Sequence, residues 1–180
     1  KELTEAYGVD TLRYFTLRDM SFGLDSSFNS EAIVGRQNSD LANDLGNLYS
    51  RAFAMVKKYR DSVVPEPAEY TPEDLEFQEG ARKMIMQYRE MIDQFRCHLG
   101  IRAVWEYVGQ ANRYIVTNDP WSLAKNPADA KRLDTVLVNI LECLRVLTLV
   151  LKPVMPGAAS KMAAGLALEN GDARISSLAE

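Results

Sequence analysis

Apolar residues recur every three or four positions along almost the whole chain, and no stretch alternates between polar and apolar residues as a half-buried strand would. Proline and glycine fall mainly between these periodic stretches, where helices end. With 180 residues, of which 47% are hydrophobic, the chain is long enough to bury one sizeable core. The sequence therefore predicts an all-α fold, a single compact bundle of helices.

The pattern predicts six helices, at 8–20, 29–60, 71–95, 101–118, 126–152 and a short one from 156 onward. Asn29, Thr71 and Asn126 stand where the second, third and fifth helices begin, and their side chains can cap those helices. A break near Leu99 and Gly100 should separate the third helix from the fourth.

The long helix at 29–60 carries a buried stripe beside a polar row. The residues expected in the stripe are Val34, Leu41, Leu45, Leu48, Ala52, Met55 and Tyr59. The polar row, at three- and four-residue steps, consists of Asp40, Asp44, Asn47 and Arg51. A charged row on the outer face of a helix usually meets water, so we expect the carboxylates of Glu31, Asp40 and Asp44 to be solvated rather than catalytic.

Several classes of protein are disfavoured by the sequence. The longest apolar stretch, 133–151, predicts a core helix and no membrane span, because it is interrupted by Asp134, Asn139, Glu142 and Arg145. No secretory signal stands at the start and two cysteines make no disulfide framework, so we expect a cytoplasmic protein. The chain opens at Lys1, without a methionine, directly into a helical pattern, which indicates a piece of a longer protein.

Cys97 and His98 suggest a metal site at first sight. Adjacent helical residues point about 100° apart, however, and Cys143 alone cannot complete a tetrahedral site, so structural roles are expected and no metal. The chain also has no nucleophile motif, glycine-rich phosphate loop or dinucleotide fingerprint. We therefore expect no catalytic residues and no cofactor within this chain.

The formal net charge of −4 argues mildly against nucleic acid as a partner, because nonspecific phosphate binding needs a basic surface. The charge is stronger evidence against a protein that coats nucleic acid than against one that reads a few exposed bases. We expect neither DNA nor a membrane as a partner.

Trp121 follows Pro120 in a predicted loop instead of repeating on a helical stripe. Proline fixes its own backbone angle and biases Asp119 away from helix, so a stiff turn presents the tryptophan. The ring can serve as a stacking platform for a base or as a lid over the core, and the residues alone favour neither. Trp105, by contrast, falls in an apolar helical stripe and is expected to pack in the core.

Asn47 and Arg51 lie one turn apart, and their side chains carry the donors and the acceptor needed to read base edges. The commoner use of such residues is a surface pair that hydrogen-bonds locally, or with Asp44. Asn112 lies near the inner edge of its helix and is expected to satisfy buried backbone groups.

Four segments resemble methionyl-tRNA synthetases. Residues 28–60, with the string LANDLGNLYSR, resemble the first long helix of that family's anticodon-binding domain, and residues 112–125, NRYIVTNDPWSLAK, resemble its second signature. Residues 7–28 resemble the segment that follows the family's KMSKS loop, and residues 151–156, LKPVMP, match the closing turn of the bundle. The resemblance implies a helical bundle of the class I aminoacyl-tRNA synthetase anticodon-binding type at 28–180, preceded at 1–27 by a linker and stem-contact segment that follows the catalytic domain.

The resemblance also implies a site. Asn47 and Arg51, with Trp121 and its neighbour Pro120, would form the pocket for the CAU anticodon of methionine tRNA. In the family the tryptophan stacks on the first anticodon base, a cytosine, while the asparagine and arginine hydrogen-bond that base and the next. Candidates for contacts to the RNA backbone are Arg36, Arg113 and Lys125.

The parent enzyme implied by the resemblance ligates methionine to its initiator and elongator tRNAs with ATP. The nucleotide-binding fold, the HIGH and KMSKS motifs and the zinc-carrying insertion are absent from this sequence. ATP, its magnesium and any zinc would therefore be bound outside this chain, which alone would not be catalytic.

Two alternatives stay open. The first is the anticodon domain of another class I synthetase, such as that for leucine, valine, isoleucine or cysteine. The combination of Asn47, Arg51 and Trp121 favours methionine over these. The second is a helical bundle used purely for protein association or structural support, for which insensitivity to the anticodon would be evidence.

Overall fold

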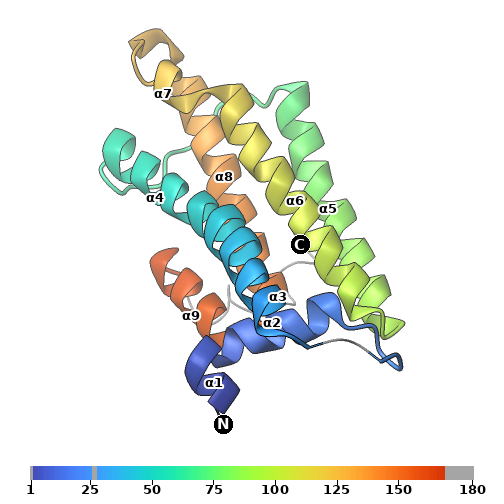
Figure 1. Ribbon diagram of the computed structural model, residues 1–180. Helices are drawn as coiled ribbons and strands as arrows, with labels where there is room; N and C mark the ends of the chain where they lie inside the picture. Colours follow the sequence, from blue (N-terminus) through green and yellow to red (C-terminus); the bar gives the residue numbers. More distant parts are fainter. Residues whose placement is uncertain (1, 26–27, 169–180) are drawn as a thin grey trace.

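The computed structural model describes residues 2–25 and 28–168, and within that part of the chain every regular element is a helix (Figure 1). The all-α prediction is confirmed. In chain order the elements are α1 (Glu2–Tyr7), α2 (Val9–Asp19), α3 (Ser30–Arg36), the π-helix η1 (Gln37–Gly46), α4 (Asn47–Arg60), α5 (Pro72–Asp93), α6 (Cys97–Asn118), α7 (Pro120–Leu123), the 3₁₀ turn η2 (Pro127–Asp129), α8 (Ala130–Leu151) and α9 (Pro156–Gly165).

The bundle is built from α5, α6, α8 and the continuous column of α3, η1 and α4 (Figure 1). The short α7 lies at one end of this bundle, and α1 and α2 lie at the other (Figure 1). The sequence explains several of these boundaries. The Asn29 side chain accepts the Ala32 amide at 2.7 Å and caps α3, and Thr71 and Asp74 form a reciprocal capping box at the start of α5.

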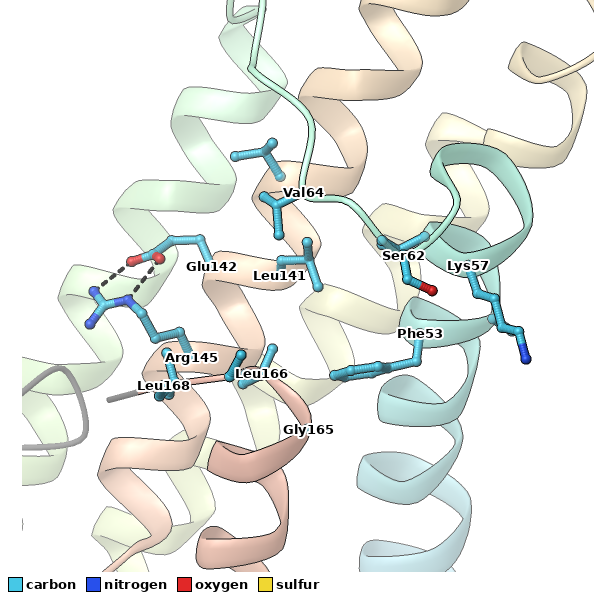
Figure 2. A pocket seen from close by; sticks show the side chains of 14 residues that line it. Phe53, Lys57, Ser62, Val64, Leu141, Glu142, Arg145, Gly165, Leu166 and Leu168 are labelled. Carbon is cyan, nitrogen blue, oxygen red and sulfur yellow. Dashed lines mark hydrogen bonds and ion pairs between the residues drawn. The ribbon is translucent and has the colours of Figure 1, made fainter. Parts of the chain in front are cut away.

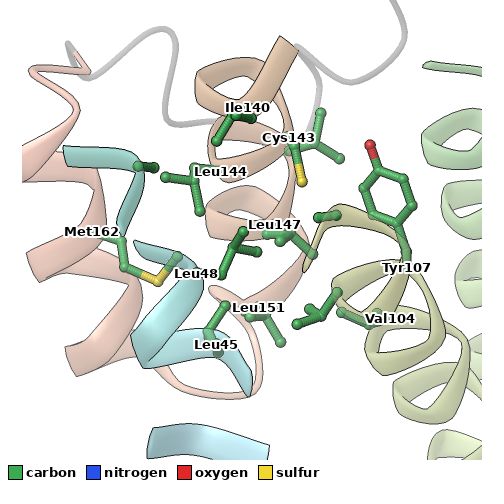
Figure 3. Packing of buried hydrophobic residues seen from close by; sticks show 14 of the residues in the cluster. Leu45, Leu48, Val104, Tyr107, Ile140, Cys143, Leu144, Leu147, Leu151 and Met162 are labelled. Carbon is green, nitrogen blue, oxygen red and sulfur yellow. The ribbon is translucent and has the colours of Figure 1, made fainter. Parts of the chain in front are cut away.

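α8 is the central helix of the core. Its side chains are buried on most of its faces, which fits a helix that is apolar nearly all round. Figure 3 shows Leu144 and Leu147 of α8 in one cluster with Leu48 of α4 and Val104 of α6. Each of these side chains is fully buried, and each such burial contributes about 1.5 to 3 kcal/mol. None of the helices in the described ranges is long and apolar enough to cross a membrane.

The helix expected at 29–60 is not a uniform α-helix, because residues Gln37–Gly46 form a π-helix. A π-helix bonds residue i to i+5, so the 3.6-residue spacing of an α-helix does not carry through it. Two predictions are wrong for this reason. Val34 is 42% exposed instead of buried, and Asp40 is only 6% exposed instead of solvated. The Asp40 carboxylate accepts hydrogen bonds from the hydroxyls of Tyr14 and Ser39, both at 2.6 Å.

The break expected near Leu99 and Gly100 lies earlier, between α5 and α6, where Phe95 has a positive φ of 57°. Gly100 is inside α6. A Cβ on it would come within 3.3 Å of the Tyr88 carbonyl oxygen and 3.4 Å of the Met91 Cβ. This glycine therefore serves the close approach of α5 and α6 rather than a turn.

α2 is tied into the bundle by burial and by hydrogen bonds. Its Tyr14 is fully buried, with the ring centroid 4.5 Å from that of Trp105, whose predicted place in the core is confirmed. Arg13 donates to the carbonyl of Val154 at 3.0 Å, between α8 and α9. Asp10 accepts the amide of Ala158 at 2.5 Å, in the first turn of α9. α2 thus packs both on the core and on α9.

Candidate nucleic-acid interface

Arg51 of α4 and Trp121 of α7 lie together although they are far apart in the sequence. The guanidinium carbon of Arg51 is 5.9 Å from the centroid of the Trp121 ring, within the range of a cation–π contact. The tryptophan is 40% exposed, so part of the ring stays open to solvent. A solvent-exposed aromatic ring beside a cation is suited to binding a planar, electron-rich group.

Trp121 was expected in a loop, but it lies in α7, a helix of four residues. Pro120 is buried at the first position of this helix, where a proline is well tolerated because the missing N–H would have no partner there. Asp119, with φ 44° and ψ 58°, both ends α6 and starts α7. The expected stiff turn is present, and the tryptophan stands just after it.

Asn47 is exposed at the start of α4, one turn before Arg51. Within the described part of the chain, no protein group hydrogen-bonds the side-chain amide of Asn47, and no carboxylate pairs with Arg51. The local pairing with Asp44 that seemed the commoner use of these residues is therefore not observed. Their donors are available to a ligand.

Asn112 ties α6 to the π-helix immediately before this site. Its Nδ2 donates to the carbonyls of Asp44 and Val108, each at 3.2 Å. The prediction that Asn112 satisfies backbone groups is confirmed. The bond to Asp44 also fixes the chain three residues before Asn47.

The candidates for RNA-backbone contacts differ in their surroundings. Arg36 is paired with Asp19 at 2.8 Å and with Asp40 at 3.3 Å, so its charge is already neutralised. Arg113 and Lys125 are exposed. Of the three, these two are the ones whose charge faces solvent.

A buried polar network beside α7 was missed by sequence reasoning. The side chain of Asp74 is fully buried and accepts hydrogen bonds from the Tyr114 hydroxyl and from Arg132, each at 2.5 Å. Arg132 also donates to the side-chain oxygen of Asn118, the last residue of α6. The only local signal was the capping role of Asp74, since nothing near it in the sequence points to Arg132.

The charge of Asp74 is set by two opposing effects. Burial raises the pKa of this carboxyl, but hydrogen bonds from Arg132, Tyr114 and the Thr71 amide outweigh burial and lower the pKa to about 2. Asp74 is therefore a permanent anion near neutral pH, fully satisfied by its donors.

The cysteines and the histidine do not come together. Cys97 and His98 begin α6, whereas Cys143 is buried in the core, and burial raises the pKa of its thiol to about 12. Among the described residues, no group of histidine, cysteine and acidic side chains could hold a metal ion.

A separate apolar cavity of about 570 Å³ lies between α4, α8 and the end of α9 (Figure 2). Phe53, Leu141 and Leu166 line it, and the ion pair between Glu142 and Arg145 stands at its side (Figure 2). None of the four predicted site residues lines this cavity.

Comparison with known proteins decides the family. Residues 64–177, more than half of the chain, match the family model described as the anticodon binding domain of methionyl tRNA ligase. The chain belongs to this anticodon-binding domain family. Residues 1–53 match a second model, that of class I tRNA synthetases of the methionine type. The resemblance predicted from the sequence is confirmed for the methionyl-tRNA ligase family, in preference to the other class I synthetases.

Curated relatives from this methionyl-tRNA ligase family are similar over nearly all of the chain. The chain is 42% identical over 162 residues to the methionine–tRNA ligase of Caldanaerobacter subterraneus subsp. tengcongensis, covering 90% of this chain and 25% of that protein. It is 42% identical over 168 residues to that of Deinococcus radiodurans, covering 93% of this chain and 25% of that protein. The chain thus spans about a quarter of the length of these relatives.

Solved structures from the methionyl-tRNA ligase family share the fold. The free Mycobacterium tuberculosis methionyl-tRNA synthetase superposes with a TM-score of 0.94 at 38% sequence identity, over 98% of this chain and 36% of that chain. The same synthetase in complex with methionyl-adenylate gives the same TM-score and identity, over 35% of that chain.

Proposed function

We propose that this chain recognises the CAU anticodon of methionine tRNA as part of a methionine–tRNA ligase, which joins methionine to its tRNA with ATP. The observation that carries the proposal is the pairing of Arg51 with the half-open ring of Trp121, one turn from the unbonded amide of Asn47. Family membership supports it independently.

Each side chain has a distinct role in this proposal. Unpaired loop bases expose both faces and their Watson–Crick edges, so they are read by stacking and by directional donors. Trp121 stacks on the first anticodon base, and Pro120 holds the start of its helix. Arg51 and Asn47 hydrogen-bond the edges of that base and the next. The acidic net charge is compatible with this mode, because recognition rests on a few bases rather than on many phosphates.

The remaining functions belong to other parts of the parent enzyme. A solved relative carries methionyl-adenylate, and we assign ATP, magnesium, the adenylate and any zinc to the portion of the ligase outside this chain. Residues 28–180 would form the anticodon-binding domain, and residues 1–27 the linker that contacts the tRNA stem. Initiator and elongator tRNAs share the CAU anticodon and would bind alike, in the cytoplasm. Neither DNA nor a membrane is a partner in this proposal.

Fluorescence anisotropy with labelled anticodon stem-loops tests the proposal. The wild-type chain should prefer a CAU loop over one with a changed first base. Trp121→Ala should lose this preference and weaken binding to CAU by about 1 to 3 kcal/mol, because a stacked base is worth that much. Phe95→Ala is a matched control. Phe95 is also an exposed aromatic residue, but it lies just before α6, at the opposite end of that helix from Trp121.

The control variant should bind like the wild type. Unselective or absent binding by the wild-type chain would contradict the proposal and favour a bundle used for protein association. A large loss of helicity in Trp121→Ala would contradict the surface role of this ring.

A further inference from the structure

Three helix ends are joined through the guanidinium of Arg132. Asp74 itself lies in the first turn of α5, Arg132 in the first turn of α8, and Asn118 is the last residue of α6. Arg132 grips Asp74 through two nitrogens, at 2.5 and 3.0 Å, and donates to the Asn118 side chain as well. Asn118 is held a second time, because its Nδ2 donates to the Tyr114 carbonyl at 3.0 Å.

The network continues into the core through neutral groups. The Tyr114 hydroxyl donates to Asp74 and accepts from Asn139 Nδ2 at 2.9 Å, and Asn139 accepts from Gln78 at 2.9 Å. Every member thus has a partner, so the network is rigid. A buried ion pair is weak evidence of stabilisation by itself, since apolar residues of the same volume often serve as well. Its geometry points instead to a positional role.

The direction of α7 is set by the residues around it. A helix of four residues is too short to be stable alone, so its neighbours must hold it in place. It joins α6 through Asp119, which has a left-handed φ of 44°, a conformation that few residues other than glycine, asparagine and aspartate adopt. The Oδ1 atom of Asp119 is buried without a hydrogen bond in the described part of the chain. Two anchored residues flank this joint: Asn118, which is hydrogen-bonded to Arg132 and Tyr114, and Pro120, which is buried.

We propose that Asp74, Arg132 and Tyr114 are positioning residues that act through Asn118 to fix the ring of Trp121 beside Arg51. The position of the Trp121 ring is inferred from the geometry alone. Its consequence for stacking on an anticodon base rests on the proposed function.

Fluorine NMR of the chain labelled with fluorotryptophan tests the positioning directly. The chain has two tryptophans, so the resonance of Trp121 reports on α7 while that of Trp105 reports on the core, and Trp121→Phe assigns the two. Asn118→Ala cuts the link between the network and α7 but leaves Asp74 and Arg132 paired. We expect the Trp121 resonance to shift or broaden and that of Trp105 to stay in place.

Two matched controls separate positioning from general loss of stability. Gln94→Ala removes an amide side chain at the end of α5, whose bond within the described part of the chain is an exposed one to Glu90. This variant should leave the Trp121 resonance unchanged. Tyr114→Phe should move the Trp121 resonance, whereas Tyr107→Phe should not. The two variants are matched because both tyrosines belong to α6 and stack on Phe77, with ring centroids 4.3 Å away for Tyr114 and 5.3 Å away for Tyr107. The inference is overturned if the Trp121 resonance is unmoved in both Asn118→Ala and Tyr114→Phe, or moves equally in the controls.

Binding of the CAU stem-loop tests the consequence for stacking. Asn118→Ala should raise the dissociation constant roughly threefold to tenfold, as expected for the loss of one supporting hydrogen bond. If the Trp121 resonance moves but the wild-type chain does not prefer CAU, the positioning stands and the proposed function fails. If CAU is preferred and the resonance moves without any change in affinity, the network does not serve recognition and that part of the inference is wrong.

Discussion

The guanidinium of Arg51 pairs with no carboxylate in the described ranges, although acidic residues outnumber basic ones in the chain as a whole. The guanidinium lies instead beside the ring of Trp121. A fork of donors held beside an aromatic face and left unused by the protein can bond the edge of a planar base in a directional way.

Arg51→Ala should weaken binding of the CAU stem-loop by about 1 to 3 kcal/mol and reduce the discrimination between cytosine and other first bases. Arg51→Lys should restore part of the affinity but little of the discrimination, because an ammonium group keeps the charge without the planar fork. Anisotropy titrations with loops carrying each of the four first bases measure both effects. Equal weakening for every loop would show that Arg51 contacts phosphate instead.

The sequence placed Asn47 and Arg51 on one helix face, because a four-residue step is a local property of a helix. It also identified Trp121 as a tryptophan presented by a proline turn. The contact between Arg51 and Trp121 depends on how α4 and α7 each pack on α8, which no local pattern contains. The pairing of Asp74 with Arg132 was missed for the same reason.

The capped start of α5 makes the stability of the protein depend on pH. The pKa of Asp74 is about 2 in the folded protein, below its ordinary value of about 3.9, so its charge stabilises the fold above about pH 4. This contribution, about 2.6 kcal/mol, is lost as the pH falls through the folded value near 2.

Asp74→Asn should therefore lower the free energy of unfolding most at neutral pH. The difference from the wild type should shrink between about pH 4 and pH 2. Urea denaturation at a series of pH values measures this difference. Asp134→Asn is a suitable control, because Asp134 is also paired with an arginine, Arg60, but is partly exposed. A constant difference for Asp74→Asn across this range would mean that Arg132 and Tyr114 do not depress the pKa of Asp74.

Helix starts were predicted well because capping is local chemistry, as Asn29 and Thr71 illustrate. The interior of the long column was predicted poorly. The 3.6-residue spacing describes an α-helix only, so it could not reveal the π-helix that turns Asp40 toward the core. Gly100 was read as a helix breaker because a sequence does not reveal how closely two helices approach.

At the scale of the whole molecule, α2 connects the core to α9. Asp10→Ala removes the carboxylate that accepts the Ala158 amide, and the start of α9 should lose about 0.5 to 2 kcal/mol, as helix caps do. Hydrogen exchange should become faster in the amides of α9 while those of α5 keep their protection. Equal acceleration in both helices would indicate that Asp10 supports the whole bundle.

The ten residues of η1 have a consequence for how this site can change during evolution or design. An α-helix turns the chain by about 100° per residue and a π-helix by less, so converting Gln37–Gly46 to regular α-helix at the same length would rotate everything beyond it relative to Tyr14 and α2. Asn47 and Arg51 would then face a different direction with their chemistry unchanged. The helix type of this segment, and not only its composition, therefore determines where the two side chains point.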